Sequence, residues 1–210
     1  MSAHRLIGLF SLAVLAGLTA ASQSRPECPK VIASLMPKAG EKVTGSYNAM
    51  GISAQGFGVA QIPYKPPCPC PTIDPYPAKV SVELLHYEGE GVQLLQMQIE
   101  GVEQQRIQNT MAEFTRRQPK STEHNALHPT HTEKVAGGTL VLYDYRSQCI
   151  TDCKGEGYPA GDYVVPHVNL LGVSHTDSSS VVVTVEGAIP VDMAKSLAQE
   201  IFQNLKNARF

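Results

Sequence analysis

The clearest hydrophobic pattern lies at the C-terminal end of the chain. Between positions 191 and 207, large apolar side chains recur every fourth residue, which is the spacing of one buried face of an α-helix. Pro190 precedes this pattern, and proline is favoured where a helix begins, because its missing N–H would have no partner there. We therefore predict a C-terminal helix with a buried stripe of four residues: Met193, Leu197, Ile201 and Leu205.

Alternating apolar and polar positions predict most of the strands. Residues 79–87 alternate, a glycine-containing turn follows at 88–91, and residues 92–99 are expected to return as the second strand of a hairpin. Pro166 places one later strand at an edge or a bulge, since proline cannot donate a hydrogen bond to a neighbouring strand. Three later segments rich in apolar residues are predicted to be strands: 138–146, 163–175 and 180–187.

Helical spacing returns after Gly101. Ile107, Met111 and Phe114 fall at i, i+4 and i+7, and Pro119 is expected to end this mid-chain helix. The order of strands, helix, strands and helix predicts an α+β fold. We expect an antiparallel sheet of about five to six strands, with the mid-chain helix and the C-terminal helix packed on it.

The first part of the chain carries a different set of signals. Residues 1–22 contain a basic residue, an apolar run and then small residues, which is the pattern of a cleaved secretory signal peptide. The run is shorter than the ~20 residues that a membrane-spanning helix needs. The mature protein is therefore expected to be soluble, to lie in the periplasm or outside the cell, and to have no membrane span.

Residues 23–78 are expected to form an N-terminal arm before an α+β domain at 79–210. The arm begins with a short helical segment at 31–36, and a glycine-rich stretch at 43–63 predicts one or two irregular strands. Residues 63–77 contain seven prolines, so we expect them to run as an extended strap over the surface.

The charge and composition of the chain argue against nucleic acid as a binding partner. The chain has 17 lysines and arginines against 19 acidic residues, and its basic residues are scattered. Binding to nucleic acid needs a clustered positive face, which this pattern does not predict. An unidentified protein or a small molecule is the expected partner.

Five cysteines are consistent with an exported protein, in which disulfide bonds are the usual state. The spacing of Cys149 and Cys153 favours a local bridge between them, and Cys28 is expected to pair with Cys68 or Cys70. Because the number of cysteines is odd, at least one thiol is left unpaired or pairs with another molecule. Neither C-P-C nor C-x3-C has the C-x-x-C spacing of thioredoxin-like motifs, so a thiol-redox or metal role is the weaker alternative.

The segment EHNALHPTHTEK places His124, His128 and His131 at i, i+4 and i+7. On one helix these imidazoles would share a face, but Pro129 interrupts any helix there. On a regular strand His131 would point away from the other two. We therefore predict a solvated polar loop, with binding of zinc or another transition metal as the alternative.

No sequence motif identifies a nucleophile, a phosphate-binding loop or a pair of catalytic carboxylates. The expected function is that of an exported, non-enzymatic binding or accessory module with no cofactor. The first alternative is a transition-metal-binding protein, or a metal-dependent hydrolase, that uses the histidines at 124–131. A thiol-redox accessory protein is the second alternative.

Overall fold

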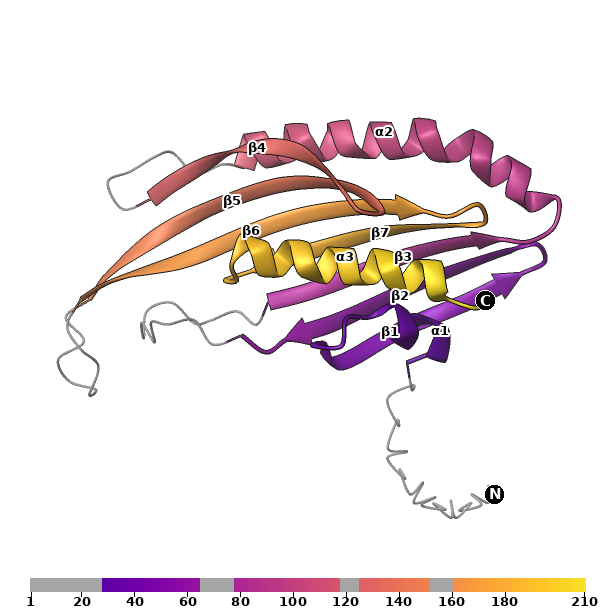
Figure 1. Cartoon of the computed structure of the whole chain (residues 1–210), viewed down its shortest axis with the longest axis horizontal. Coiled ribbons are helices and arrows are strands. Elements are labelled where there is room, and N and C mark those ends of the chain that lie inside the picture. The colour runs from indigo at the N-terminus through magenta and orange to yellow at the C-terminus, as the bar shows by residue number, and fades with distance from the viewer. Residues whose placement is uncertain (1–27, 65–77, 118–124, 152–160) are drawn as a thin grey trace, which may run out of the picture.

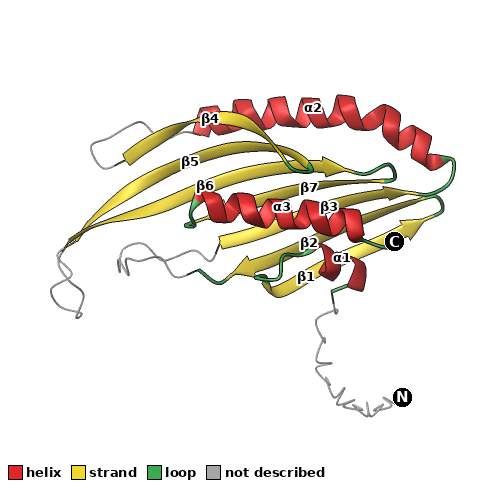
Figure 2. Ribbon diagram, in the orientation of Figure 1, coloured by secondary structure: helices red, strands yellow, loops and turns green. Residues whose placement is uncertain are grey.

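The structure is a computed structural model that describes residues 28–64, 78–117, 125–151 and 161–210. In this part of the chain, seven antiparallel strands form one sheet with the order β1-β2-β3-β7-β6-β5-β4. Figures 1 and 2 show two long helices that run along the sheet. The predicted α+β class is confirmed, and the sheet has more strands than the five to six expected.

The sheet consists of two runs of neighbouring strands that meet where β3 pairs with β7. The first run is β1 (Glu41–Met50), β2 (Ser53–Ile62) and β3 (Ala78–Tyr87). The second run is β4 (Asn125–Val135), β5 (Gly138–Thr151), β6 (Gly161–His175) and β7 (Ser179–Gly187).

Glycines in β1 and β2 make room for a short helix, α1 (Lys30–Leu35). A Cβ atom added at Gly58 would lie 2.4 Å from Cγ2 of Ile32, and one added at Gly45 would lie 2.8 Å from the same atom. Real Cβ atoms do not approach so closely, so a larger residue at either position would displace α1. The glycine-rich segment is therefore a β1–β2 hairpin, with a register shift between Glu41 and Thr44, whose glycines let α1 pack closely.

The C-terminal helix α3 (Val191–Asn207) packs on the same face of the sheet as α1. Three residues of its predicted stripe are buried: Leu197 is 4% exposed, Ile201 is fully buried and Leu205 is 2% exposed. The fourth, Met193, is partly buried against the same core. This face holds the larger core, in which α3 covers apolar residues of β3, β5, β6 and β7. The prediction of a C-terminal helix packed on a sheet is confirmed.

The opposite face carries α2 (Gly91–Arg117), a helix of 27 residues. Phe114 of α2 packs on Val141 and Tyr143 of β5, whereas α3 packs on the alternate β5 positions Leu140 and Leu142. Successive residues of a strand point to opposite faces, so the two helices sandwich the sheet. The predicted packing of Ile107, Met111 and Phe114 is confirmed.

The prediction of a strand at 92–99 was wrong, because these residues form the first turns of α2. Leu95 and Ile99 are four residues apart and both are buried, as on one face of a helix. The segment is also rich in leucine, glutamine and methionine, which favour helices over strands. Gly101, which was expected to separate two elements, lies inside the helix.

Two further expectations need correction or refinement. The histidine segment was expected to be a loop, but residues 125–135 form the edge strand β4. Pro166 lies in β6, which has neighbours on both sides along most of its length. However, β7 pairs with β6 only from Val168 onward, so at Pro166 only β5 is adjacent among the described strands.

No helix within the described ranges has both the length and the apolar character needed to cross a membrane.

Candidate functional site

A polar hollow of about 550 Å³ lies beside the N-terminal end of α3. Its lining includes His131 of β4, Asp144 and Arg146 of β5, and Asp192 of α3. We call this site the polar hollow. It brings charged and hydrogen-bonding side chains together from three separate elements.

A β-bulge in β4 determines how His131 reaches the polar hollow. The backbone of His128 is paired with Asp144 and that of His131 with Leu142, so three steps along β4 match two steps along β5. A regular strand would place positions 128 and 131 on opposite faces, and the extra residue of the bulge cancels this difference. On a regular strand His131 would lie on the opposite face from His128. With the bulge, the backbone register places both positions on the same face.

The hydrogen bond of His131 defines its tautomer. Its Nδ1 lies 3.1 Å from the carbonyl oxygen of Pro129, and a carbonyl oxygen can only accept. Nδ1 therefore donates, and in the neutral ring Nε2 keeps an acceptor lone pair. Farther along β4, Glu133 pairs with Lys195 of α3 at 2.5 Å, which ties the edge strand to the helix.

Charges of both signs meet in the polar hollow. Asp144 is 9% exposed and lies on the α3 side of β5, because it follows Leu142 by two residues. Arg146 is exposed two residues farther on. Asp192 lies in the first turn of α3, where the partial positive charge of a helix N-terminus favours a carboxylate.

An aromatic stack of Tyr145 and His167 adjoins the polar hollow, and both residues contribute to its lining. Tyr145 also packs on the cluster at the α2 face of the sheet. The rings of Tyr145 and His167 are stacked with centroids 4.5 Å apart and an interplanar angle of 9°. Burial lowers the pKa of His167 and raises the pKa of Tyr145. Both effects favour neutral rings, which suit an apolar stack between two strands.

The described residues leave the predicted histidine site untested. His124 lies outside the described residues, and of His128 only the backbone position is described. Within the described ranges, no three His, Cys, Asp or Glu residues are grouped closely enough to hold a metal ion. The metal alternative for His124, His128 and His131 therefore stays a prediction.

The disulfide predictions also stay open. Among the described residues Cys28 has no disulfide partner, and burial raises the pKa of its thiol. Its expected partners, Cys68 and Cys70, lie outside the described residues, as does Cys153. Cys149 belongs to the β5 strand, opposite Tyr163 of β6.

One arrangement resembles the parts of a nucleophilic site but is enclosed. Nδ1 of His86 lies 2.8 Å from Oγ of Ser179, and Nε2 of His86 lies 3.7 Å from Oε1 of Glu88. Ser179 is fully buried, and Phe210 stacks on the imidazole with centroids 4.3 Å apart. A substrate could not reach this hydroxyl in the folded chain, so we interpret the group as a buried polar contact.

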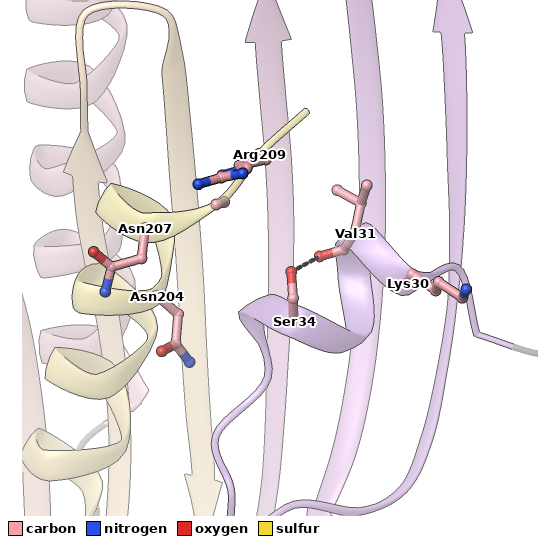
Figure 3. A pocket seen from close by; sticks show the side chains of 7 residues that line it. Lys30, Val31, Ser34, Asn204, Asn207 and Arg209 are labelled. Atoms are coloured by element: carbon pink, nitrogen blue, oxygen red, sulfur yellow. Dashed lines mark hydrogen bonds between the residues drawn. The ribbon is translucent and has the colours of Figure 1, made fainter.

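A crevice between α1 and the end of α3 was the other charged candidate (Figure 3). It is lined by Lys30 and Arg209, together with serine and asparagine side chains. Figure 3 shows that the side chain of Lys30 extends away from α3, whereas that of Arg209 lies over the end of α3. The two cations therefore do not converge on one ligand.

The sequence reasoning missed Asp144, Arg146 and Asp192. Asp144 and Arg146 are two residues apart in β5 and so share a face, but only the position of α3 brings Asp192 to them, and only the pairing of β4 with β5 adds His131. No local pattern marks them. The chain was also compared with protein-family models, curated proteins and solved structures, and none of them matches it.

Proposed function

We propose that this protein is an exported, non-enzymatic binding module whose ligand occupies the polar hollow. The observation that carries the proposal is the convergence of His131, Arg146 and Asp192 on one hollow of about 550 Å³. Small-molecule sites are commonly ~300–1,000 Å³ and use a few well-placed polar groups for orientation. The hollow fits that description better than it fits a catalytic site.

The side chains favour a small, strongly polar ligand. Arg146 presents a planar cation suited to a carboxylate, and Asp192 presents an acceptor for an amine or a hydroxyl group. His131 adds an Nε2 acceptor when its ring is neutral. A ligand with both donor and acceptor groups would match this lining.

The test is an NMR titration of the full mature chain with glutamate, citrate and glucose as separate probes. We expect at least one probe to shift the backbone amide signals of His131, Arg146 and Asp192. Arg146→Met keeps the aliphatic stem and removes the charge, and should weaken that binding by the ~1.5–3 kcal/mol typical of hydrogen bonds to charged groups. Arg117→Met is the matched control, because Arg117 pairs with Glu113 on α2, away from the hollow.

Two outcomes would count against the polar hollow as the ligand site. One is binding that leaves these three amide signals in place, and the other is binding that Arg146→Met does not change. Zinc serves as a fourth probe for the metal alternative. A rise in melting temperature with zinc, lost when His124, His128 and His131 are all replaced by alanine, would favour metal binding instead.

Export is a separate part of the proposal. It is supported by the signal-peptide pattern of residues 1–22. Intact-mass measurement of the exported protein should give a chain that begins at Ser22 or Gln23. A mass that includes Met1 would contradict cleavage.

A further inference from the structure

A second hollow, which we call the α2 groove, lies between the middle of α2 and the strands beneath it. It has a volume of about 350 Å³ and is separate from the polar hollow. Val102, Glu103 and Arg106 of α2 form one wall. Residues of β2, β3 and β7 form the rest, including Leu85 and Val182.

The α2 groove exists because α2 is apolar at its two ends and polar in its middle. Leu95 and Ile99 are buried near the start of the helix, and Phe114 is buried near its end. Between them Val102 is 61% exposed. The middle of the helix is joined to the sheet by polar contacts, and side chains do not fill the space under it.

Two acidic residues and one arginine determine the charge of the α2 groove. Arg106 binds Glu83 of β3 at 2.8 Å, so these two charges offset each other. Glu103 has neutral partners when His175 is unprotonated: Nδ1 of His175 lies at 3.2 Å and Oγ of Ser180 at 3.4 Å. With a neutral His175, the groove therefore carries one net negative charge, at Glu103.

The position of Glu103 makes that charge available inside the α2 groove. Its side chain is only 17% exposed, so it lies mostly within the fold. Both His175 and Ser180 contact the same oxygen, Oε1. Among the described residues, no hydrogen bond reaches the second oxygen, Oε2, which leaves an acceptor for an incoming donor.

Apolar side chains form part of the lining around this carboxylate, beside the polar side chains of Gln55 and Ser180. Leu85 and Val182 line the groove, and Val102 stands over it. Phe57 of β2 is paired in register with Glu83, so it lies on the same face of the sheet, and it is 45% exposed. A lining that combines apolar side chains with one carboxylate whose charge no cation of the described residues offsets is complementary to a molecule that has an apolar body and one positive charge.

We propose that the α2 groove binds a small organic cation with an apolar body, such as an alkyl- or arylammonium. The ammonium group donates to Glu103, and the apolar body lies on Leu85 and Val182 beneath Val102. This site is distinct from the polar hollow, and the proposal does not depend on the function proposed for that hollow.

The test uses three probes that share an aromatic body and differ in charge: phenethylammonium, phenethyl alcohol and phenylpropionate. Each is titrated into the full mature chain and followed through backbone amide shifts. We expect the ammonium to bind about tenfold more tightly than the alcohol, a difference of about 1.4 kcal/mol. The carboxylate should bind more weakly than either, because Glu103 repels it. The shifted amides should be those of Val102, Glu103 and Val182.

Two variants locate the charge, and a third tests the apolar contact. Glu103→Gln keeps an acceptor for His175 and Ser180 and should abolish the preference for ammonium over alcohol. Glu113→Gln is the same change on the same helix outside the α2 groove, and should behave like the wild type. Val102→Ser alters an exposed side chain and should weaken the binding of the ammonium and of the alcohol by similar factors. Thermal melting of each variant verifies that it is folded.

Four results would overturn the proposal. The first is equal binding of the ammonium and the carboxylate, and the second is binding that Glu103→Gln leaves unchanged. The third is a pattern of shifts centred on His131 and Arg146, because that would place the cation in the polar hollow. Failure of all three probes to bind would also overturn it, and would leave the proposed function of the polar hollow unaffected.

Discussion

Burial of the His167 ring makes the stability of the protein depend on pH. Burial lowers the pKa of His167 below its ordinary value, so the folded chain resists protonation of this ring. The unfolded chain takes up that proton near the ordinary value of ~6.5. Between the two pKa values the unfolded state binds more protons, and the free energy of unfolding therefore falls as the pH falls through ~6.5 toward the lowered value.

His167→Phe isolates this effect. Phenylalanine retains an aromatic ring to stack on Tyr145 but cannot titrate. We expect the free energy of unfolding of the wild type, measured relative to the variant, to decrease between about pH 7 and about pH 5. Urea unfolding of both proteins at the two pH values measures the difference, in which other titrating groups largely cancel. A difference that stays constant with pH would contradict the assigned role of His167.

At the residue scale, apolar positions were more predictable than polar partners. The burial of Leu197 and Ile201 follows from a spacing of four residues, which is visible in the sequence. The contact between His86 and Ser179 spans 93 residues and depends on the register of β3 against β7. A change of register by one residue would separate them, and no local sequence pattern specifies that register.

Among the elements, α2 contains a glycine that serves no visible packing purpose. Gly101 lies inside the helix, and a Cβ atom added there would have no neighbour within 4 Å. Glycine in a helix interior costs roughly 0.5–1 kcal/mol relative to alanine, because the unfolded chain is more flexible there. Gly101→Ala should therefore raise the free energy of unfolding by that amount in urea denaturation.

Gly58→Ala is the contrasting change in a strand. A Cβ atom at this position would lie 2.2 Å from Cε of Met36 and 2.4 Å from Cγ2 of Ile32. Overpacking of this kind commonly costs ~1–3 kcal/mol, so this variant should be destabilised. Equal effects of the two substitutions would show that α1 does not pack on β2 as described.

Helices and strands were predicted correctly where the spacing of the hydrophobic residues had one clear period. The stripe of α3 and the valine-rich β7 were identified from sequence and confirmed. Residues 92–99 were assigned to the wrong type, because eight residues are too few to separate a short strand from the first turns of a helix. Pro129 excludes a helix in the histidine segment, but proline is tolerated in an edge strand with a bulge, which is how β4 accommodates it.

At the scale of the whole molecule, the two faces of the sheet differ in how much core they bury. The α3 face holds a large cluster that includes Phe202, Leu170 and Val183. Among the described side chains, the α2 face holds a smaller cluster around Phe114 and Tyr143, in addition to buried Leu95 and Ile99 of α2, and the α2 groove lies between these two regions. Since burial of apolar surface is the main stabilising term, α2 is attached less strongly than α3.

This asymmetry predicts that α2 opens before the rest of the fold. Regions with few buried apolar contacts open locally at a lower free energy than the global unfolding value. Under native conditions, the backbone amides of α2 should exchange with deuterium faster than those of α3, β3 and β7. Hydrogen exchange followed by NMR gives the rates residue by residue.

Two truncations distinguish local opening of α2 from global unfolding. Phe114→Ala should accelerate exchange in α2 and leave the slowest amides of β7 nearly unchanged, because Phe114 belongs to the small cluster. Leu197→Ala empties a site that is 4% exposed in the large cluster, and should lower the global free energy of unfolding by ~2–5 kcal/mol. The slowest amides of β7 should then exchange faster by the corresponding factor. If Phe114→Ala accelerated exchange in β7 as much as in α2, the two faces would unfold as one unit. The prediction that α2 opens separately would then be wrong.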